Sequence, residues 1–327
     1  MYRIVFLDGY AMNPGDLSMK GFEELGEVKF YERTAPEEVV ERSLEADIVV
    51  VNKVLMTKEV FSRLPRLKMV CVSATGYNVI DLDEADRRGI VVCNAPDYSS
   101  VSVAQMVFAL LLNVENHVDH YARLNREGVW AQSADFCYQD VTSHDVAGRT
   151  MGIVGMGNIG RRVAAIALAM GMRVITNSGQ PQSALPEGVE KVSWNELTAT
   201  SDVISLHVPQ TETTTGLINA STLSRMKRSA VLINTARGGL VDEQALYEVL
   251  KSGRLRAYCA DVMTKEPAPA DNRLLTLPNV YVTPHIAWAT REARTRLAEI
   301  CRMNIARFIQ GDPVNTVGKT SKSTQQR

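Results

Sequence analysis

Short apolar runs of strand type recur along the first hundred residues. They lie at 3–7, 28–31, 48–51, 69–73 and 90–93. Between them, segments such as 36–46 and 81–88 carry apolar residues at helical spacing. Runs that are apolar throughout are typical of strands covered on both faces, so the pattern predicts a parallel sheet with intervening helices.

The same alternation returns after residue 150. Strand-like runs lie at 151–154, 172–176, 203–206, 230–234, 255–260 and 280–283. Before them, residues 101–113 form a strongly apolar helical pattern, followed by a polar stretch to Trp130. A helix this apolar is typically buried, and we expect it to lie between domains or in a dimer interface.

A glycine-rich turn joins the strands at 151–154 and 172–176. Gly155, Gly157 and Gly160 have the spacing that suits a tight turn, close approach of a pyrophosphate, and packing of a helix on a strand. The helix that follows offers unpaired N–H groups to phosphates. Such glycines also occur in purely structural turns, but the strand–turn–helix–strand frame favours a dinucleotide site.

The acid that commonly holds the ribose 2′-hydroxyl is absent from the end of the second strand. Ser178, preceded by Asn177, occupies that position, and the next acid is Glu187. A carboxylate there would repel a 2′-phosphate, so its absence favours NADP as the cofactor. No arginine follows the strand directly to pair with that phosphate, so NAD stays open.

Composition excludes several functional classes. The 327 residues carry a formal net charge of −1, which leaves no basic surface for nucleic acid. The apolar start is too short for a signal peptide, and 103–114 is too short for a membrane span. Five dispersed cysteines indicate reduced thiols in a cytoplasmic protein. His117 and His120 lack a suitably spaced third ligand, so we expect no metal site.

Three polar residues follow predicted strands of the second half. His285 can act as an acid or base near neutral pH, and Glu266 can orient its imidazole and stabilise the protonated form. Arg237 offers a planar fork that matches a carboxylate. Each has a structural alternative, such as a surface ion pair or a buried histidine. Together, downstream of a dinucleotide turn, they predict hydride transfer on a 2-hydroxy acid.

Two loops in the first half also follow strand ends. Lys53 lies in one, and Thr75 with Gly76 in the other. Ligands of open α/β sheets collect at these ends, so backbone N–H groups at Thr75 and Gly76, with the charge of Lys53, can hold a small carboxylate. An ordinary turn with a solvated lysine is the alternative.

These motifs resemble the D-isomer-specific 2-hydroxyacid dehydrogenase family over nearly the whole chain, excluding the polar tail from Thr316. The matching pieces are ATGYNVID at 74–81, GMGNIG at 155–160, HVPQTETTTGLIN at 207–219, INTARGGLVDEQAL at 233–246, ADVMTKEP at 260–267 and TPHIAWAT at 283–290. The resemblance implies an α/β protein of two Rossmann-like lobes with doubly wound parallel sheets. The dinucleotide-binding domain, 99–288, is inserted into a substrate domain made of 1–98 and 289–327.

The resemblance also implies site residues. Arg237, Glu266 and His285 form the catalytic set. Together with the strand-end loops described above, this gives Lys53, Thr75, Gly76, Arg237 and Trp288 as the predicted substrate contacts. The cofactor contacts are Gly155, Gly157, Asn158, Ile159, Gly160, Ser178, Val208, Pro209, Thr214, Thr235, Ala236, Arg237, Asp261, His285 and Ala287. Asp261 is implied to contact the nicotinamide carboxamide, and closure of the lobes is expected to exclude water.

The pattern HIAWA looks most like the glycerate dehydrogenase, or hydroxypyruvate reductase, branch. It implies a cytoplasmic homodimer, paired through about 101–147, that interconverts hydroxypyruvate or glyoxylate with D-glycerate or glycolate using NADP or NAD. A dehydrogenase for bulkier D-2-hydroxy acids is one alternative. The other is a nucleotide-sensing binding protein similar to the C-terminal-binding transcriptional corepressors.

Overall fold

The structure, a computed structural model, describes residues 1–318. The end of the polar tail, 319–327, which the sequence analysis assigned to the substrate domain, lies outside the described residues. The chain forms two compact units. Unit 1 comprises Met1–Ser99 and the chain from Ala289 onward, and unit 2 comprises Ser100–Trp288.

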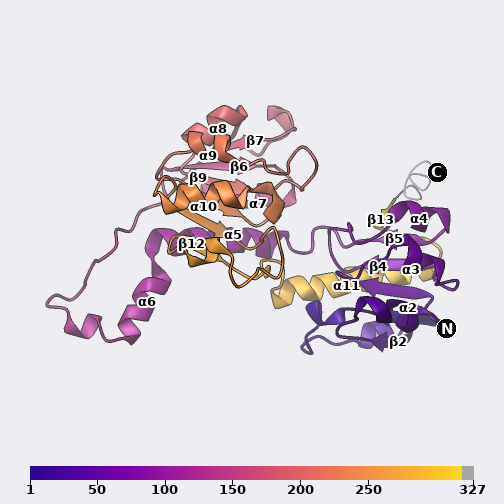
Figure 1. Cartoon of the computed structure of the whole chain (residues 1–327). Coiled ribbons are helices and arrows are strands. Elements are labelled where there is room, and N and C mark those ends of the chain that lie inside the picture. The colour runs from indigo at the N-terminus through magenta and orange to yellow at the C-terminus, as the bar shows by residue number, and fades with distance from the viewer. Residues whose placement is uncertain (319–327) are drawn as a thin grey trace. The chain divides into compact units, whose positions relative to one another are not determined.

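Unit 1 is built on a six-stranded sheet in the order β13-β5-β4-β3-β1-β2 (Figure 1). Its strands are β1 (Tyr2–Phe6), β2 (Gly26–Phe30), β3 (Ile48–Val51), β4 (Met69–Val72), β5 (Val91–Cys93) and β13 (Thr316–Val317). The first five are parallel, as predicted, and β13 pairs antiparallel with β5. The chain runs from β1 outward to β2 and then returns to β3 on the other side, so the strand order reverses between β1 and β3.

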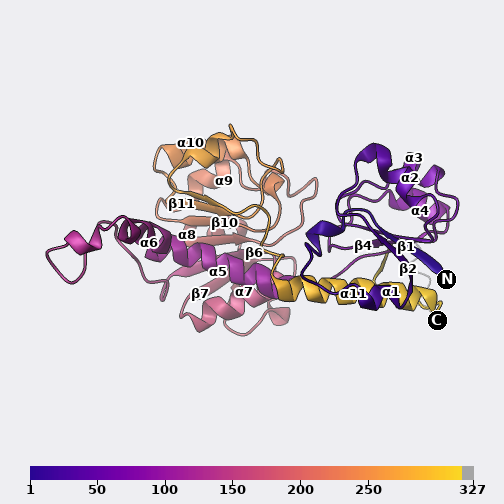
Figure 2. The same cartoon turned by 90° about the horizontal axis from the view of Figure 1, so that it is seen from below.

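The helices of unit 1 are short except the last. They are α1 (Lys20–Glu23), α2 (Val39–Ser43), α3 (Lys58–Ser62), α4 (Leu82–Arg87) and α11 (Arg291–Ile309), with 3₁₀ turns at Gly9–Ala11 and Pro36–Glu38. The helix predicted at 36–46 therefore begins as a 3₁₀ turn, where Pro36 lacks a backbone N–H. Figure 2 shows α11 along one side of this sheet, where it packs against β4.

Unit 2 contains a seven-stranded, fully parallel sheet in the order β12-β11-β10-β9-β6-β7-β8. Its strands are β6 (Thr150–Val154), β7 (Arg173–Asn177), β8 (Val189–Lys191), β9 (Val203–Leu206), β10 (Val231–Asn234), β11 (Ala257–Ala260) and β12 (Val280–Val282). The sequence predicted all of these except β8, which is three residues long and half exposed. The order reverses between β6 and β9.

Helices cover both faces of this sheet (Figure 1). They are α5 (Ser100–Asn116), α6 (Val118–Arg126), α7 (Asn158–Ala169), α8 (Trp194–Thr200), α9 (Ala220–Arg225) and α10 (Glu243–Lys251), with 3₁₀ turns at Trp130–Gln132, Gln182–Ala184, Gly238–Leu240 and Arg273–Thr276. One core packs α5 and α7 on the sheet, and the other packs α8, α9 and α10 on the opposite face. The doubly wound, parallel α/β architecture predicted for both halves is confirmed.

The apolar helix predicted at 101–113 is α5, and most of its residues are buried, as expected. Its buried side chains, including Val107 and Leu111, belong to the core of unit 2 itself. Its continuation, α6, has no buried residue, and Figure 1 shows α6 and the loop that follows it projecting from unit 2. Among the described helices, none alone is long and apolar enough to cross a membrane. Taken together, α5 and α6 have the length and composition of a membrane span, but they are bent by 60°.

His120 on α6 pairs with a residue that the sequence analysis did not connect to it. Its Nε2 lies 2.8 Å from Asp140 Oδ2, and this contact holds the pKa of Asp140 below its usual range. His117 Nε2 lies 3.2 Å from Thr142 O. Within the described residues, no group of three or more potential ligands is arranged to hold a metal ion.

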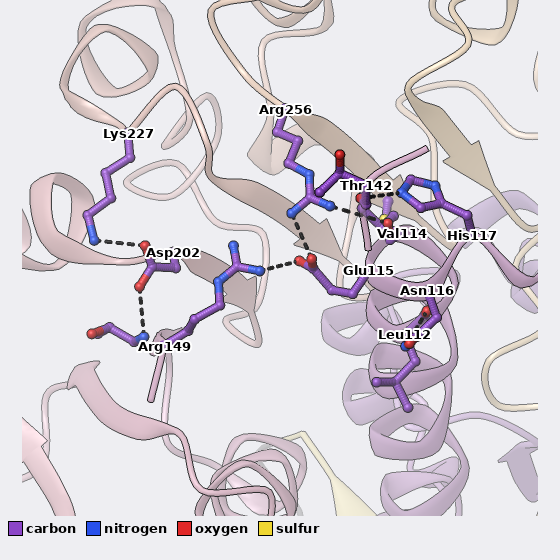
Figure 3. A network of polar contacts seen from close by, with 12 residues as sticks. Leu112, Val114, Glu115, Asn116, His117, Thr142, Arg149, Asp202, Lys227 and Arg256 are labelled. Atoms are coloured by element: carbon purple, nitrogen blue, oxygen red, sulfur yellow. Dashed lines mark hydrogen bonds and ion pairs between the residues drawn. The ribbon is translucent and has the colours of Figure 1, made fainter. Parts of the chain in front are cut away.

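A buried ion network ties α5 to the amino ends of the sheet strands of unit 2 (Figure 3). The carboxylate of Glu115, which is fully buried, lies 2.7 Å from Arg149 Nη1 and 2.7 Å from Arg256 Nη1. Arg149 immediately precedes β6 and Arg256 immediately precedes β11. Parallel strands present their functional loops at the carboxyl ends, so this network lies at the structural edge of the sheet.

Candidate active site

The glycine turn lies at the carboxyl end of β6, where the strand order of unit 2 reverses. Gly155 has φ +94°, and a Cβ there would lie 2.7 Å from His207 O. A Cβ on Gly160 would lie 2.2 Å from Gly155 O, so the helix can pack this closely only with glycine. The space beside Gly157 is open, and Gly157 gives α7 no side-chain cap. The first N–H groups of α7 therefore suit a phosphate.

Two buried polar atoms near this edge have no hydrogen-bond partner within residues 1–318. They are Nδ1 of His207, which follows β9, and Oγ1 of Thr235, which follows β10. The other ring nitrogen of His207 lies 2.8 Å from Ser205 Oγ. Burial lowers the pKa of His207 to about 3, so its imidazole is neutral. Buried polar atoms are nearly always paired in proteins, and these two fit a site that holds a polar ligand.

The loop after β7 is contacted by two cations that the sequence analysis did not assign, Arg161 of α7 and Lys191 of β8. Arg161, on the first turn of α7, donates from Nη2 to the side-chain oxygen of Gln180. Lys191 Nζ donates to Gln180 O at 2.7 Å, and Gln180 N donates to Ser178 Oγ at 3.2 Å. Gln180 Nε2 reaches Met156 O at 3.1 Å and ties this loop to the glycine turn. The edge near Ser178 is thus positively charged.

His285 and Glu266, proposed from sequence as an acid–base pair, are in direct contact. His285 Nδ1 lies 2.7 Å from Glu266 Oε2. The second carboxylate oxygen of Glu266 accepts the backbone N–H of Met263 at 3.0 Å. Both side chains are about one-third exposed, at 29% and 35%. The pair is held in place and still open to a ligand.

The backbone of His285 adopts a left-handed conformation, with φ +56°. Asp261, which is 1% exposed, stabilises this turn. Its Oδ1 accepts from Ile286 N at 2.8 Å and from Thr283 Oγ1 at 2.6 Å, and its Oδ2 accepts from Ala287 N at 2.8 Å. A left-handed backbone conformation is unfavourable for residues other than glycine. The hydrogen bonds to the Asp261 carboxylate offset that cost at His285. Asp261 therefore supports the histidine loop, a role that sequence reasoning missed.

The loop that carries Arg237 is shaped by a buried asparagine. Asn234 accepts from Ala236 N at 3.1 Å and donates Nδ2 to Arg237 O at 2.8 Å. A Cβ on Gly238 would lie 2.0 Å from the carbonyl carbon of Met263, so the glycine allows this loop to pack on the Glu266 loop. The Arg237 side chain is exposed, and its Nη1 donates to Ala236 O at 2.6 Å. The loops of the three proposed catalytic residues therefore adjoin.

The remaining predicted residues of unit 2 lie in the same set of strand-end loops. Thr214 Oγ1 donates to Pro209 O at 2.7 Å and accepts from Thr211 N at 2.7 Å, which closes the loop after β9 that also carries Val208. Asn158 and Ile159 begin α7, and Trp288 is half-buried at the end of the unit.

In unit 1, the predicted anion-binding residues follow neighbouring strands. Lys53 is exposed after β3, and Thr75 is exposed after β4. The side chain of Thr75 donates to Ala95 O at 2.9 Å, and its carbonyl accepts from Asn94 Nδ2 at 2.8 Å. These two contacts fix the loop. Sequence reasoning missed Asp8, whose carboxylate accepts backbone N–H groups of the loop that carries Lys53.

The fold and these loops define a dinucleotide-binding α/β protein with an acid–base pair beside its nucleotide edge. The model of the D-isomer specific 2-hydroxyacid dehydrogenase NAD-binding domain matches residues 108–287. A hydroxypyruvate reductase from Blautia hydrogenotrophica is 43% identical over 321 residues, which cover 97% of this chain and 100% of that relative. A glycerate dehydrogenase from Methylorubrum extorquens is 42% identical over 96% of this chain and 98% of its own.

A solved acyclic imino acid reductase in complex with NADPH and D-Arg aligns with a TM-score of 0.84 and 34% identity, covering 96% of this chain and 99% of that structure. The chain belongs to the D-isomer specific 2-hydroxyacid dehydrogenase family. It is therefore an oxidoreductase of that family, and a nicotinamide dinucleotide is its cofactor.

Proposed function

We propose that this enzyme reduces small 2-oxo acids, hydroxypyruvate or glyoxylate, to D-glycerate or glycolate, and can catalyse the reverse oxidation. The observation that carries the proposal is the contact of His285 with Glu266 beside the Arg237 loop, at the carboxyl edge of a dinucleotide-binding sheet. The names of the two relatives above support a short, hydroxylated substrate.

The chain's own groups have distinct roles in this reaction. The Arg237 guanidinium binds the substrate carboxylate and polarises the 2-oxo oxygen. His285 donates a proton from Nε2 to that oxygen, because its Nδ1 is occupied by Glu266. Glu266 fixes the orientation of the ring through its contact with Nδ1. When bound, the reduced nicotinamide supplies the hydride to C2, which completes the conversion of the carbonyl to an alcohol.

The residues around the glycine turn would hold the cofactor. The N–H groups of α7 would bind its pyrophosphate, with Gly155, Gly157 and Gly160 allowing the approach. Thr235 and the neutral His207 supply unpaired polar atoms on the next strands. Asp261 retains acceptor capacity at Oδ2 for the nicotinamide carboxamide, although its main contacts support the His285 loop.

We propose NADP as the preferred form of the cofactor. Ser178 and Gln180 replace the acid that would repel a 2′-phosphate, and Arg161 and Lys191 supply positive charge at this loop. Arg161 can exchange its contact with Gln180 for the phosphate oxygens. The relative solved with NADPH is consistent with this preference.

On unit 1, we propose that Lys53 and the N–H groups of Thr75 and Gly76 contribute to binding the substrate carboxylate. On unit 2, we propose that Trp288 limits the size of the substrate. The exposed apolar residues of the projecting segment support a homodimer paired through it. They include Val118 at 60%, Trp130 at 53% and Phe136 at 90% exposed. A cytoplasmic location stays a prediction.

The test is His285→Ala, assayed for hydroxypyruvate reduction and for NADPH binding by fluorescence titration. Loss of a general acid typically costs 10²- to 10⁴-fold in turnover, so we expect kcat to fall by roughly that factor. The dissociation constant for NADPH should change by no more than about twofold to threefold, because the imidazole acts on the substrate. Equal losses in turnover and cofactor affinity would contradict the assignment.

A further inference from the structure

Asp8 occupies the point in unit 1 where a ligand would be expected from topology alone. It follows β1 by two residues, and the loop 52–54 directly follows β3. The strand order reverses between β1 and β3. Open α/β sheets bind ligands beyond the carboxyl ends of strands at such a reversal.

Three successive backbone N–H groups converge on the Asp8 carboxylate. Asn52 N donates to Oδ1 at 2.7 Å, while Lys53 N and Val54 N donate to Oδ2 at 2.5 Å and 3.0 Å. Consecutive N–H groups that point into one concavity form an anion-binding site. Here the chain's own carboxylate fills that site, so an external anion must bind beside it.

The same loop is linked to the neighbouring strand end. Asn52, which is 8% exposed, donates Nδ2 to Ser73 O at 2.7 Å, and Ser73 N donates to Val51 O at 2.8 Å. Ser73 begins the loop that carries Thr75 and Gly76. The carboxylate of Asp8 thus fixes the 52–54 loop, whose exposed residue is Lys53, and Asn52 links this loop to the one that carries Thr75 and Gly76.

We propose that Asp8 is a positioning residue for substrate binding, which acts by holding the 52–54 loop so that the Lys53 ammonium is presented to the substrate carboxylate. This inference rests on the proposed function and deepens it. Because the carboxylate of Asp8 fills the anion site at the reversal between β1 and β3, the substrate carboxylate would bind at Lys53 and the loop after β4 instead.

The first experiment compares Asp8→Asn and Asp8→Ala with the wild-type enzyme in steady-state reduction of hydroxypyruvate. A carboxamide offers one acceptor oxygen in place of two, so at least one of the three N–H groups loses its partner. We expect KM for hydroxypyruvate to rise tenfold or more, while kcat falls less than threefold and KM for NADPH is unchanged. An unchanged KM for hydroxypyruvate in a folded variant overturns the inference.

A double-mutant cycle with Lys53→Met separates positioning from general loosening. If Asp8 acts through Lys53, adding Asp8→Asn to Lys53→Met raises KM by less than twofold further. Independent, multiplicative effects of the two substitutions overturn the proposed link. Should Asp8→Ala fail to fold, Asp8→Asn carries the cycle, with circular dichroism and NADPH binding as checks of its fold.

Asp47 provides a matched control at the opposite end of β3. It is 4% exposed, accepts Arg3 N at 3.0 Å and pairs with Lys68 at 3.0 Å. Asp47→Asn should lower the melting temperature without changing KM for hydroxypyruvate. A rise in KM equal to that of Asp8→Asn would show that the loss of any carboxylate that accepts backbone N–H groups in unit 1 has this effect, and would overturn the specific role.

The proposed function fails in a different way from this inference. If the wild type reduces hydroxypyruvate and His285→Ala does not, the function stands, and an Asp8→Asn enzyme with wild-type KM overturns the inference alone. If the wild type reduces no small 2-oxo acid, both are overturned.

Discussion

Glu266 Oε2 lies 2.7 Å from Nδ1 of His285, and the other oxygen of the same carboxylate accepts the backbone N–H of Met263. The glutamate is therefore oriented by the backbone and in turn orients the imidazole. This leaves Nε2 as the nitrogen that, in the proposed reaction, exchanges a proton with the substrate. The direction of the ring, which decides whether an acid can reach the 2-oxo oxygen, is set by this contact within the chain.

Asp261→Ala should lower turnover through the backbone of His285. The substitution removes the acceptors of Ile286 N and Ala287 N, and the left-handed turn at His285 loses the contacts that offset its cost. We expect kcat to fall at least tenfold. Asp261→Asn keeps one acceptor oxygen and should lose less. Steady-state rates check this, and a kcat for Asp261→Ala within twofold of the wild type would show that the turn holds without the carboxylate.

Arg161→Gln should discriminate between the two cofactors. Charge-assisted hydrogen bonds contribute about 1.5–3 kcal/mol, so KM for NADPH should rise roughly tenfold or more while KM for NADH stays constant. Arg162→Gln is the matched control, because Arg162 is the next residue on α7 and is exposed. Equal changes of KM for both cofactors in Arg161→Gln would exclude a specific contact with the 2′-phosphate.

His207 should make the stability of unit 2 sensitive to acid. Its folded-state pKa is lowered from 6.5 to about 3 by burial, so the unfolded chain takes up a proton that the folded protein does not. The contribution is fully present above pH 6.5 and is lost as the pH falls towards 3, by about 1.4 kcal/mol for each pH unit. Urea unfolding between pH 6.5 and 5.5 should show a steeper loss for wild type than for His207→Asn. Parallel pH profiles would contradict the burial of a neutral imidazole.

Glu115→Ala should destabilise unit 2 strongly. Removing one member of a buried ion network leaves its partners uncompensated, which costs about 3–5 kcal/mol, and here two arginines lose their carboxylate (Figure 3). The control is Glu190→Ala, which breaks a half-exposed pair with Arg173 in the same unit and should cost at most about 1 kcal/mol. Urea unfolding curves measure both. A similar, small loss in the two variants would show that the network contributes little.

Periodicity predicted the fold well because strands buried on both faces leave an apolar signature in the chain. It located eleven of the twelve parallel strands that the structure describes within two residues, for example β9 at Val203–Leu206. It missed β8 and β13, which are short edge strands with half-exposed side chains.

The sequence predicted the parts of the candidate site whose residues lie within one motif. It did not predict contacts that depend on which strands are neighbours in the sheet. The glycine turn and the residues Arg237, Glu266 and His285 lie in recognisable motifs. Asp8 contacts backbone atoms more than forty residues away, and that contact exists only because β1 and β3 are adjacent in the sheet. Arg161 likewise reaches the β7 loop from another element. Contacts of this kind follow from strand order, which a single sequence does not display.

The most direct test of the central claim is the initial rate of hydroxypyruvate reduction, with NADPH and NADH titrated separately. We predict turnover with both cofactors and a clearly higher kcat/KM with NADPH, because the edge at Ser178 lacks an acid and carries Arg161 and Lys191. A preference for NADH would support the proposed reductase activity but overturn the proposed preference for NADP. No turnover of hydroxypyruvate or glyoxylate with either cofactor would contradict the proposed substrate class.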